Sequence, residues 1–224
     1  MKATVLTALA GSMVVAGAAN AALLQVVAEE YVGDGWVANG YQGLVTYRIY
    51  AEFSGEAGDG VVAIFGNADS PLSWQSTNGT FYNASILNSL TAPQDATPSI
   101  WLNQWDTYVT VGVDDADGDA TSLSPGFSAE VNALASNFSA TNAAYFITPD
   151  EMQGMPDANG RVLIGQLTLF EGDSFIFGSA LGTGSQLGLQ DYNGTQYLNV
   201  PIIPGPGALA LLGLAGLAGT RRRR

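Results

Sequence analysis

The chain has 224 residues, of which 47% are hydrophobic and 12% are charged, so it has the material for one domain with a sizeable core. Cysteine and histidine are both absent, which excludes disulfides, thiolate catalysis, a Ser-His-Asp triad and the usual zinc ligand sets. Between Lys2 and the four terminal arginines, 20 acidic residues face two basic ones, a net charge of −18 that repels phosphate backbones and excludes nucleic acid as a partner.

The N-terminus has the pattern of a secretory signal peptide. Lys2 precedes an apolar stretch that is broken only by small residues, and Ala19-Asn20-Ala21 places small side chains where signal peptidase requires them. We therefore expect residues 1–21 to form a signal helix that enters the Sec export machinery. Cleavage is expected after Ala21 or one residue later.

Period-two alternation predicts that the middle of the chain is built from β-strands. Apolar and polar residues alternate through 44–53, LVTYRIYAEF, and again through 107–113, TYVTVGV. Residues 61–66 and 161–170 are more continuously apolar and are predicted as strands buried on both faces. Further short strands are predicted at 23–28, 79–82, 144–148, 174–178 and 196–200.

Helical periodicity is scarce between these strands. Apolar residues at helical spacing predict one short helix near 129–138, with 84–90, ASILNSL, as a weaker second. Neither helix is long enough to connect parallel strands. The pattern therefore favours an all-β fold, an antiparallel β-sandwich of Ig-like or jelly-roll type, over a passenger domain at 22–200.

An acidic stretch, VDDADGDA, follows the strand predicted at 107–113. Its alternating Asp115, Asp117 and Asp119 can supply the oxygen ligands that Ca²⁺ prefers. An EF-hand-like loop that starts at Asp115 requires glycine at its sixth position and an acid at its twelfth, but these positions are Ala120 and Gly126. Two interpretations stay open, a calcium site or a solvated turn. No other cofactor is predicted.

Two further groups of residues suggest carbohydrate chemistry. Aromatic faces can stack on sugar rings, and two acids about 5–10 Å apart across a cleft can hydrolyse a glycosidic bond. In a domain without disulfides, however, large aromatics usually fill the core, and adjacent acids in one turn are a poor sign of catalysis. The aromatic candidates are Trp36, Trp74, Trp101, Trp105 and Tyr108, and the acidic pairs are Asp150 with Glu151 and Glu171 with Asp173.

The C-terminal segment 201–224 has a different composition from the rest of the chain. The thirteen residues from Gly207 to Gly219 carry no polar side chain and would span about 20 Å as a helix, against about 30 Å for a bilayer core. Four arginines, Arg221, Arg222, Arg223 and Arg224, follow and can reach the headgroups. These features predict a short transmembrane helix at 207–219 that is a marginal anchor.

This tail resembles the PEP-CTERM sorting signal of exported bacterial proteins. The resemblance covers about residues 200–224, where Pro204-Gly205-Pro206-Gly207 precedes an Ala- and Leu-rich run and the arginine cluster. Glycine stands at position 205, where the family motif has glutamate. The resemblance implies recognition by an exosortase-like membrane transpeptidase, after which the passenger reaches the cell surface or the extracellular matrix.

The sequence as a whole predicts an exported surface or matrix protein of structural or adhesive type, without enzymatic activity. Extracellular polysaccharide is a candidate partner. The alternative is a secreted carbohydrate-binding module or carbohydrate-active enzyme on a jelly roll. Buried tryptophans and an acidic surface would favour the first interpretation, and a cleft with opposed carboxylates and exposed tryptophans the second.

Overall fold

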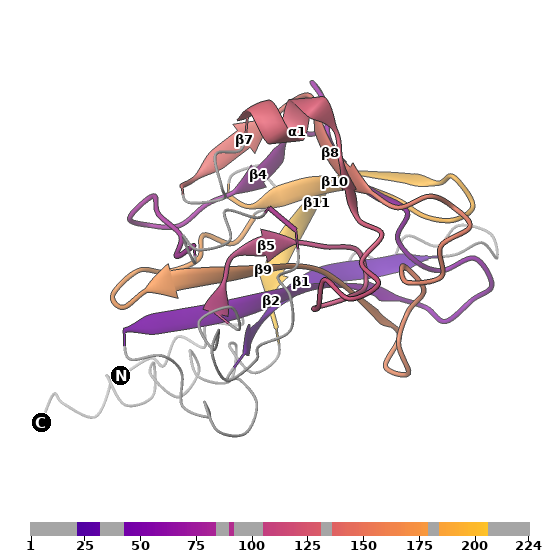
Figure 1. Cartoon of the computed structure of the whole chain (residues 1–224), viewed down its shortest axis with the longest axis horizontal. Coiled ribbons are helices and arrows are strands. Elements are labelled where there is room, and N and C mark those ends of the chain that lie inside the picture. Colours follow the sequence, from indigo (N-terminus) through magenta and orange to yellow (C-terminus); the bar gives the residue numbers. More distant parts are fainter. Residues whose placement is uncertain are drawn as a thin grey trace, which may run out of the picture.

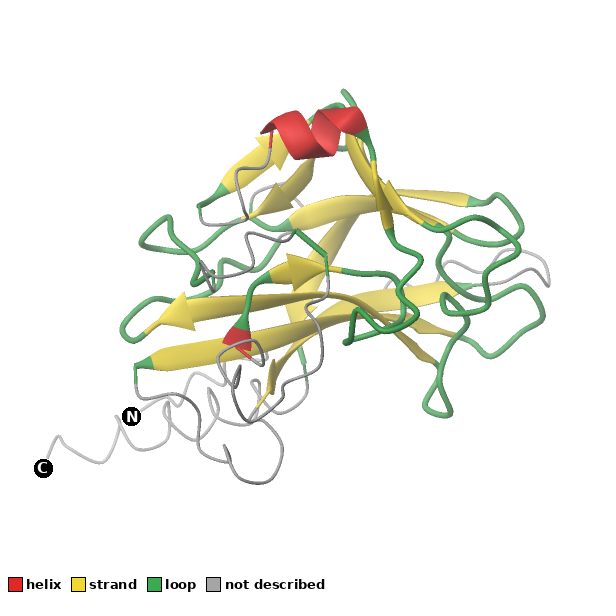
Figure 2. Ribbon diagram, in the orientation of Figure 1, coloured by secondary structure: helices red, strands yellow, loops and turns green. Residues whose placement is uncertain are grey.

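The computed structural model describes residues 22–31, 43–83, 90–91, 105–130, 136–178 and 184–205, and this part of the chain is mostly β (Figures 1 and 2). The predicted predominance of strands is confirmed. The signal helix predicted at 1–21 and the transmembrane helix predicted at 207–219 both lie outside the described residues. Within the described ranges, no helix is long and apolar enough to cross a bilayer.

The first group of strands contains the two longest ones. It comprises β1 (Leu23–Tyr31), β2 (Leu44–Phe53), β9 (Arg161–Phe170) and the short β5 (Tyr108–Val109). Their order is β5-β9-β2-β1, and all of these neighbours are antiparallel. The strands β2 and β9 have the bounds that the sequence predicts. Apolar residues alternate with polar ones along the whole of β2 and are nearly continuous along β9, so both patterns are long enough to define a strand.

The second group contains shorter strands and the helix. It has the order β10-β3-β8-β6, with β4 paired to β10 and β7 paired to β4. The elements are β3 (Ala63–Gly66), β4 (Leu72–Trp74), β6 (Ser122–Leu123), α1 (Pro125–Glu130), β7 (Phe138–Ala140), β8 (Ala143–Phe146) and β10 (Gln186–Gln190).

The last strand, β11 (Gln196–Pro204), joins the two groups. Its first part pairs antiparallel with β10, with Pro201 opposite Gln186, and its last part pairs parallel with β1, with Pro204 opposite Ala28. Figure 1 shows β11 crossing from the upper strands to the lower ones. The eleven strands therefore form one curled sheet rather than two separate sheets, and the β1–β11 pair departs from the predicted antiparallel pattern.

A local irregularity precedes this change of partner. Asn199 has a φ of 52°, and the register between β10 and β11 shifts between Leu187 and Leu189. Asparagine tolerates left-handed backbone better than most residues, and a bulge bends the strand that carries it. The backbone N–H of Asn199 donates to the hydroxyl of the buried Ser70 at 2.7 Å, which fixes the bend.

Both strand groups contribute to one core. Ile49 of β2 and Ile164 of β9 meet Ile64 of β3 and Leu187 of β10 in the same buried cluster. Tyr145 of β8 is fully buried and donates its hydroxyl hydrogen to the Ile164 carbonyl at 2.9 Å, so its polar end is satisfied across the core. The core stabilises the curl because neither group could bury its apolar face alone.

Several predicted elements differ in extent from those observed. The strand predicted at 107–113 is shortened to β5, because Gly112 turns the chain at a φ of 89° and lies against the Gln153 carbonyl. Residues predicted as strands at 79–82 and 174–178 form only isolated bridges. The helix α1 begins before the predicted 129–138, capped by the Ser124 hydroxyl on the Phe127 N–H at 3.2 Å.

Candidate functional site

The described residues include two cationic side chains, Arg48 and Arg161, and both lie on the outward face of β1, β2 and β9. Ile49 and Ala51, which alternate with Arg48 and Glu52 along β2, point into the core. Alternation along a strand therefore places the charged side chains on the opposite face. This face, together with the end of β11 beside it, is the candidate site.

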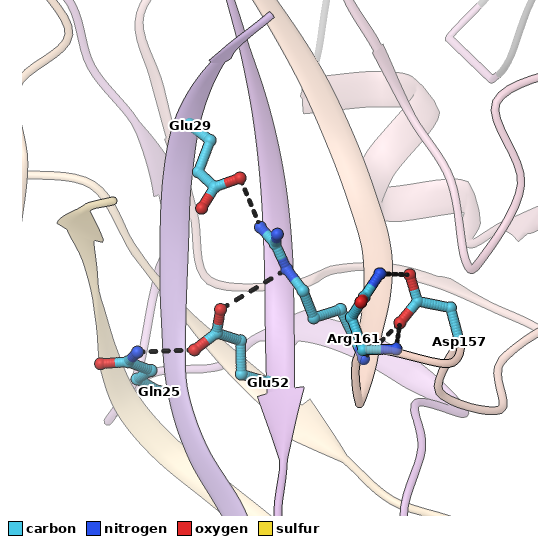
Figure 3. Close-up of polar contacts among 6 residues, drawn as sticks. Gln25, Glu29, Glu52, Asp157 and Arg161 are labelled. Carbon is cyan, nitrogen blue, oxygen red and sulfur yellow. Dashed lines mark hydrogen bonds and ion pairs between the residues drawn. The ribbon is translucent and has the colours of Figure 1, made fainter. Parts of the chain in front are cut away.

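Arg161 is the centre of a cluster of polar side chains from three adjacent strands (Figure 3). Its Nη2 lies 2.8 Å from Oε2 of Glu29, and its Nε lies 3.5 Å from Oε1 of Glu52. Glu52 also accepts a hydrogen bond of 2.6 Å from Nε2 of Gln25. The guanidinium carbon lies 3.9 Å from the centre of the Tyr50 ring, a cation–π contact. We call Gln25, Glu29, Tyr50, Glu52 and Arg161 the Arg161 cluster.

Arg48 has a similar environment on the same face. Its guanidinium lies 3.8 Å from the centre of the Tyr31 ring, 3.0 Å from Oδ2 of Asp114 and 3.1 Å from Oε1 of Gln166. Burial raises the pKa of Tyr108 far above its usual value, although the nearby Arg48 charge opposes this shift, so the phenol stays neutral. Both arginines thus neutralise carboxylates on the sheet surface and pack against tyrosine rings there.

The end of β11 lies directly beside the Arg161 cluster. The backbone N–H of Gly205 donates to the Ala28 carbonyl at 2.8 Å, and a Cβ at Gly205 would lie 2.5 Å from Cγ of Glu29. Pro204 of the predicted sorting signal is therefore the last residue of β11, beyond the predicted domain end at residue 200, and Gly205 follows it directly, hydrogen-bonded to β1. The rest of that signal, Pro206, Gly207, Arg221, Arg222, Arg223 and Arg224, lies outside the described residues.

This close approach gives a physical reason for the glycine at position 205. The Glu29 carboxylate is held by Arg161, so it cannot move away without losing its ion pair. A glutamate at 205 would add both a side chain in occupied space and a second negative charge beside Glu29. Position 205, at which the tail differs from the motif that it resembles, therefore lies where the sheet leaves no room for a side chain.

The acidic loop adopts the turn that its sequence predicts. Asp115 accepts a hydrogen bond from the Asp117 N–H at 2.9 Å, and Asp119 accepts one from the Thr121 N–H at 2.8 Å and one from Nε2 of Gln153 at 3.2 Å. Gly118 has the positive φ that this turn needs, at 82°. No group of three or more acidic side chains is placed to hold a metal ion in the part of the chain that the structure describes. Calcium binding here stays a prediction.

The aromatic candidates that the structure describes are buried. Trp74 is fully enclosed, and Trp105 and Tyr108 are each 1% exposed. Trp74 meets Phe138 edge to face at 6.4 Å, and Trp105 lies 5.9 Å from Tyr31. These three rings have no face available to a sugar. The other two candidates, Trp36 and Trp101, lie outside the described residues.

In each of the two acid pairs, one carboxyl group has a lowered pKa. Burial alone would raise the pKa of Asp173, but hydrogen bonds from Thr77, the Asn78 and Ser174 N–H groups and Ser76 outweigh it and lower the pKa. Asp150 is fully exposed, and hydrogen bonds from Thr148 and its own N–H lower its pKa. Glu171 is exposed, and the Glu151 carbonyl accepts a hydrogen bond from Tyr192. A general acid in a glycosidase needs the opposite shift, a raised pKa.

Sequence reasoning missed three buried acids, Asp59, Asp106 and Asp191. Asp59 and Asp191 are 2% and 1% exposed, and each accepts several hydrogen bonds from backbone N–H groups in its own turn. The only local sign was their position in Gly- and Asn-containing turns, which Asp69 and Asp157 share.

Comparison with protein-family models, with curated proteins and with solved structures finds no match for the chain.

Replacing Arg161 should destabilise the domain, because Glu29 and Glu52 would be left close together without a cation. We expect Arg161→Met to lower the free energy of unfolding by about 1–2 kcal/mol at low salt, measured by urea denaturation. Arg161→Lys should restore only part of this loss, since lysine lacks the planar fork. A double-mutant cycle with Glu29→Gln that shows no coupling would contradict the ion pair.

Adding a side chain at position 205 should weaken the contact between β11 and β1. We expect Gly205→Ala to destabilise the fold by about 1 kcal/mol or more through overpacking against Glu29, and Gly205→Glu to cost more. The matched control is the same substitution in a Glu29→Ala background, which makes room for the new atoms. An equal loss of stability in both backgrounds would show that Glu29 does not cause the effect.

Calcium binding by Asp115, Asp117 and Asp119 predicts a change in stability that can be measured. At a hundredfold excess over Kd, bound Ca²⁺ should raise the free energy of unfolding by about 2.7 kcal/mol. Replacing all three residues by asparagine should abolish this rise and the heat of binding in titration calorimetry. The absence of heat from the unmodified protein at millimolar calcium would leave these side chains with their turn-stabilising role alone.

Proposed function

We propose that the chain is an exported bacterial cell-surface or extracellular-matrix protein of structural type, sorted through its PEP-CTERM-like tail. Its passenger would be a sandwich-like unit in which β11 connects two facing layers, Ig-like or jelly-roll in character. An exosortase-like transpeptidase and the Sec machinery are the proposed partners for its handling. Extracellular polysaccharide is the proposed partner for its final location.

The observation that carries this proposal is the position of the junction between sheet and tail. The N–H of Gly205, the residue directly after β11, donates the last described hydrogen bond to β1, and the proline-glycine sequence of the tail begins at that point. The proposed sorting segment, residues 201–224, thus overlaps the sheet at residues 201–204 and continues beyond it. Such an arrangement lets a membrane enzyme act on the tail while the passenger keeps its sheet complete.

A structural rather than enzymatic role is supported by how the described polar residues are used. Asp150 and Asp173 have lowered pKa values, whereas a general acid needs a raised one. Asp115 and Asp119 accept hydrogen bonds from turn N–H groups, and Arg48 and Arg161 pair with carboxylates of their own sheet. The net negative charge keeps such domains apart at low salt, so assembly in a matrix would need screening or a cation.

Deleting the tail after Gly205 tests the sorting proposal. A chain that ends at Gly205 retains every residue of β11, so it should fold, but it should lose retention at the membrane and appear in the medium. The measurement is fractionation of the native host, with mass spectrometry of the mature C-terminus. Identical fractionation of the full and shortened chains would overturn the sorting proposal.

A matched variant separates charge from hydrophobicity in the same experiment. Replacing Arg221–Arg224 by four glutamines keeps the apolar run and removes only the cationic end, which should reduce retention while the fold is unchanged. The carbohydrate alternative has its own signature, since binding or turnover of a polysaccharide by the shortened chain would favour it. Failure to bind any polysaccharide together with altered sorting supports the structural role.

A further inference from the structure

Two buried carboxylates lie close to the start of β1. Asp59 ends the loop 54–59, and Asp191 begins the turn between β10 and β11; they are 2% and 1% exposed. The two segments touch, since a Cβ at Gly58 would overlap the Asn193 side chain. The described ion pairs of Arg48 and Arg161 go to Asp114, Glu29 and Glu52. Burying a carboxylate is costly unless donors or a cation offset the lost hydration.

Asp59 uses its two carboxylate oxygens differently. Oδ2 accepts hydrogen bonds from its own loop, from the Ser54 hydroxyl at 3.2 Å and from the Gly55 and Glu56 N–H groups at 2.5 and 2.7 Å. Oδ1 accepts one from the backbone nitrogen of Ala22 at 3.0 Å. The Ser54 N–H in turn donates to the Ala22 carbonyl at 3.1 Å, so both ends of Ala22 are held by this loop.

Asp191 is linked to the start of β1 through the hydroxyl of Tyr197. Its Oδ1 accepts the N–H groups of Asn193 and Thr195 at 2.9 and 2.8 Å, and its Oδ2 accepts the Tyr197 hydroxyl at 3.1 Å. That hydroxyl oxygen lies 3.4 Å from the backbone nitrogen of Leu23. The described titratable groups that hydrogen bonds link to Ala22 and Leu23, directly or through Tyr197, are therefore two carboxylates and one phenol, all acidic.

The sequence predicts that a new N-terminus forms at this position. Hydrolysis of the Ala21–Ala22 bond consumes one water, leaves a carboxylate on Ala21 and releases the nitrogen of Ala22 as an amine, which takes up a proton near neutral pH. Lys2, the one lysine of the chain, departs with the signal peptide. The new amine is therefore the one primary amine of the mature protein.

We propose that Ala22 is the mature N-terminus and that its α-ammonium group binds Asp59, so that removal of the signal peptide supplies a cation to a buried carboxylate that has no cationic partner among the described residues. A neutral peptide N–H already lies 3.0 Å from Oδ1, and an ammonium at that atom converts the contact into a charge-assisted pair. Cleavage one residue later would remove this nitrogen altogether. The inference rests on the export part of the proposed function and is independent of the sorting tail.

Amine chemistry tests the pair directly, because a mature chain without lysine has one site for an amine-reactive ester. Protein exported with its own signal should begin at Ala22 by mass spectrometry. Pairing with Asp59 should raise the pKa of the α-amine above its ordinary value of about 8, and each unit of that rise lowers the reactive unprotonated fraction about tenfold. We therefore expect labelling at pH 7 to be about tenfold slower in the folded protein than in urea.

Stability against pH gives a second readout with a defined sign. A raised pKa in the folded state means that the pair stabilises the protein fully below about pH 8, and that this contribution is lost as pH rises through the folded pKa. The urea midpoint of the free-amine protein should therefore fall between pH 8 and 10. Acetylation of the α-amine should lower the midpoint at pH 7 and remove this fall.

Asp59→Asn should make the labelling rates of the folded and unfolded protein equal. Its matched control is Asp157→Asn, which also removes a turn carboxylate that accepts two backbone N–H groups but leaves the N-terminus unchanged. If Asp59→Asn does not fold, acetylation of the unmodified protein still tests the pair. A mature start at Leu23, equal labelling rates in the folded and unfolded protein, or the same pH profile after acetylation would each overturn the proposal.

Failure of export can be distinguished from failure of the pair. If the native host does not remove the signal, the export part of the proposed function fails. A chain released by a site-specific protease so that it begins at Ala22 still tests the ion pair by labelling. Slow labelling of that chain would support the pair even then, and fast labelling would overturn it whatever the outcome of export.

Discussion

The change of partner by β11 is the constraint on which the rest of the structure depends. The strand is paired with β10 at Val200 and Pro201 and then with β1 at Ile202 and Pro204. Because one continuous strand belongs to both groups, the sheet must curl, and the curl encloses the core. The bulge at Asn199 supplies the bend just before the change of partner.

This arrangement also brings both ends of the described chain to the same strand. Ala22 directly precedes β1, and it and Leu23 lie beside Asp59 and Tyr197, while Gly205 directly follows β11 and lies against Ala28 and Glu29. In the proposed function, the two ends of β1 are thus the places where export and sorting act on the passenger. Signal-peptide removal at one end and sorting at the other would then each be coupled to the stability of the sheet between them.

Sequence patterns located the long strands well and the short ones poorly. The strands β2 and β9 alternate or stay apolar for ten residues each, which is long enough for periodicity to be read. The strands β4 and β6 have three and two residues, too few for any period. The end of β11 was missed because proline usually ends a strand, whereas Pro201 and Pro204 lie where β11 changes partner.

The sequence by itself determined the β class, the buried strand β9 and the absence of cysteine and histidine chemistry, because composition and period are properties of the sequence alone. Only the tertiary structure decided which acids are buried, since Asp59, Asp117 and Asp191 all lie in similar Gly- or Asn-containing turns. It likewise placed Gly205 against Glu29 and the Ala22 nitrogen on Asp59. These contacts join residues far apart in the chain, and burial and pairing at that range follow from the curl of the sheet.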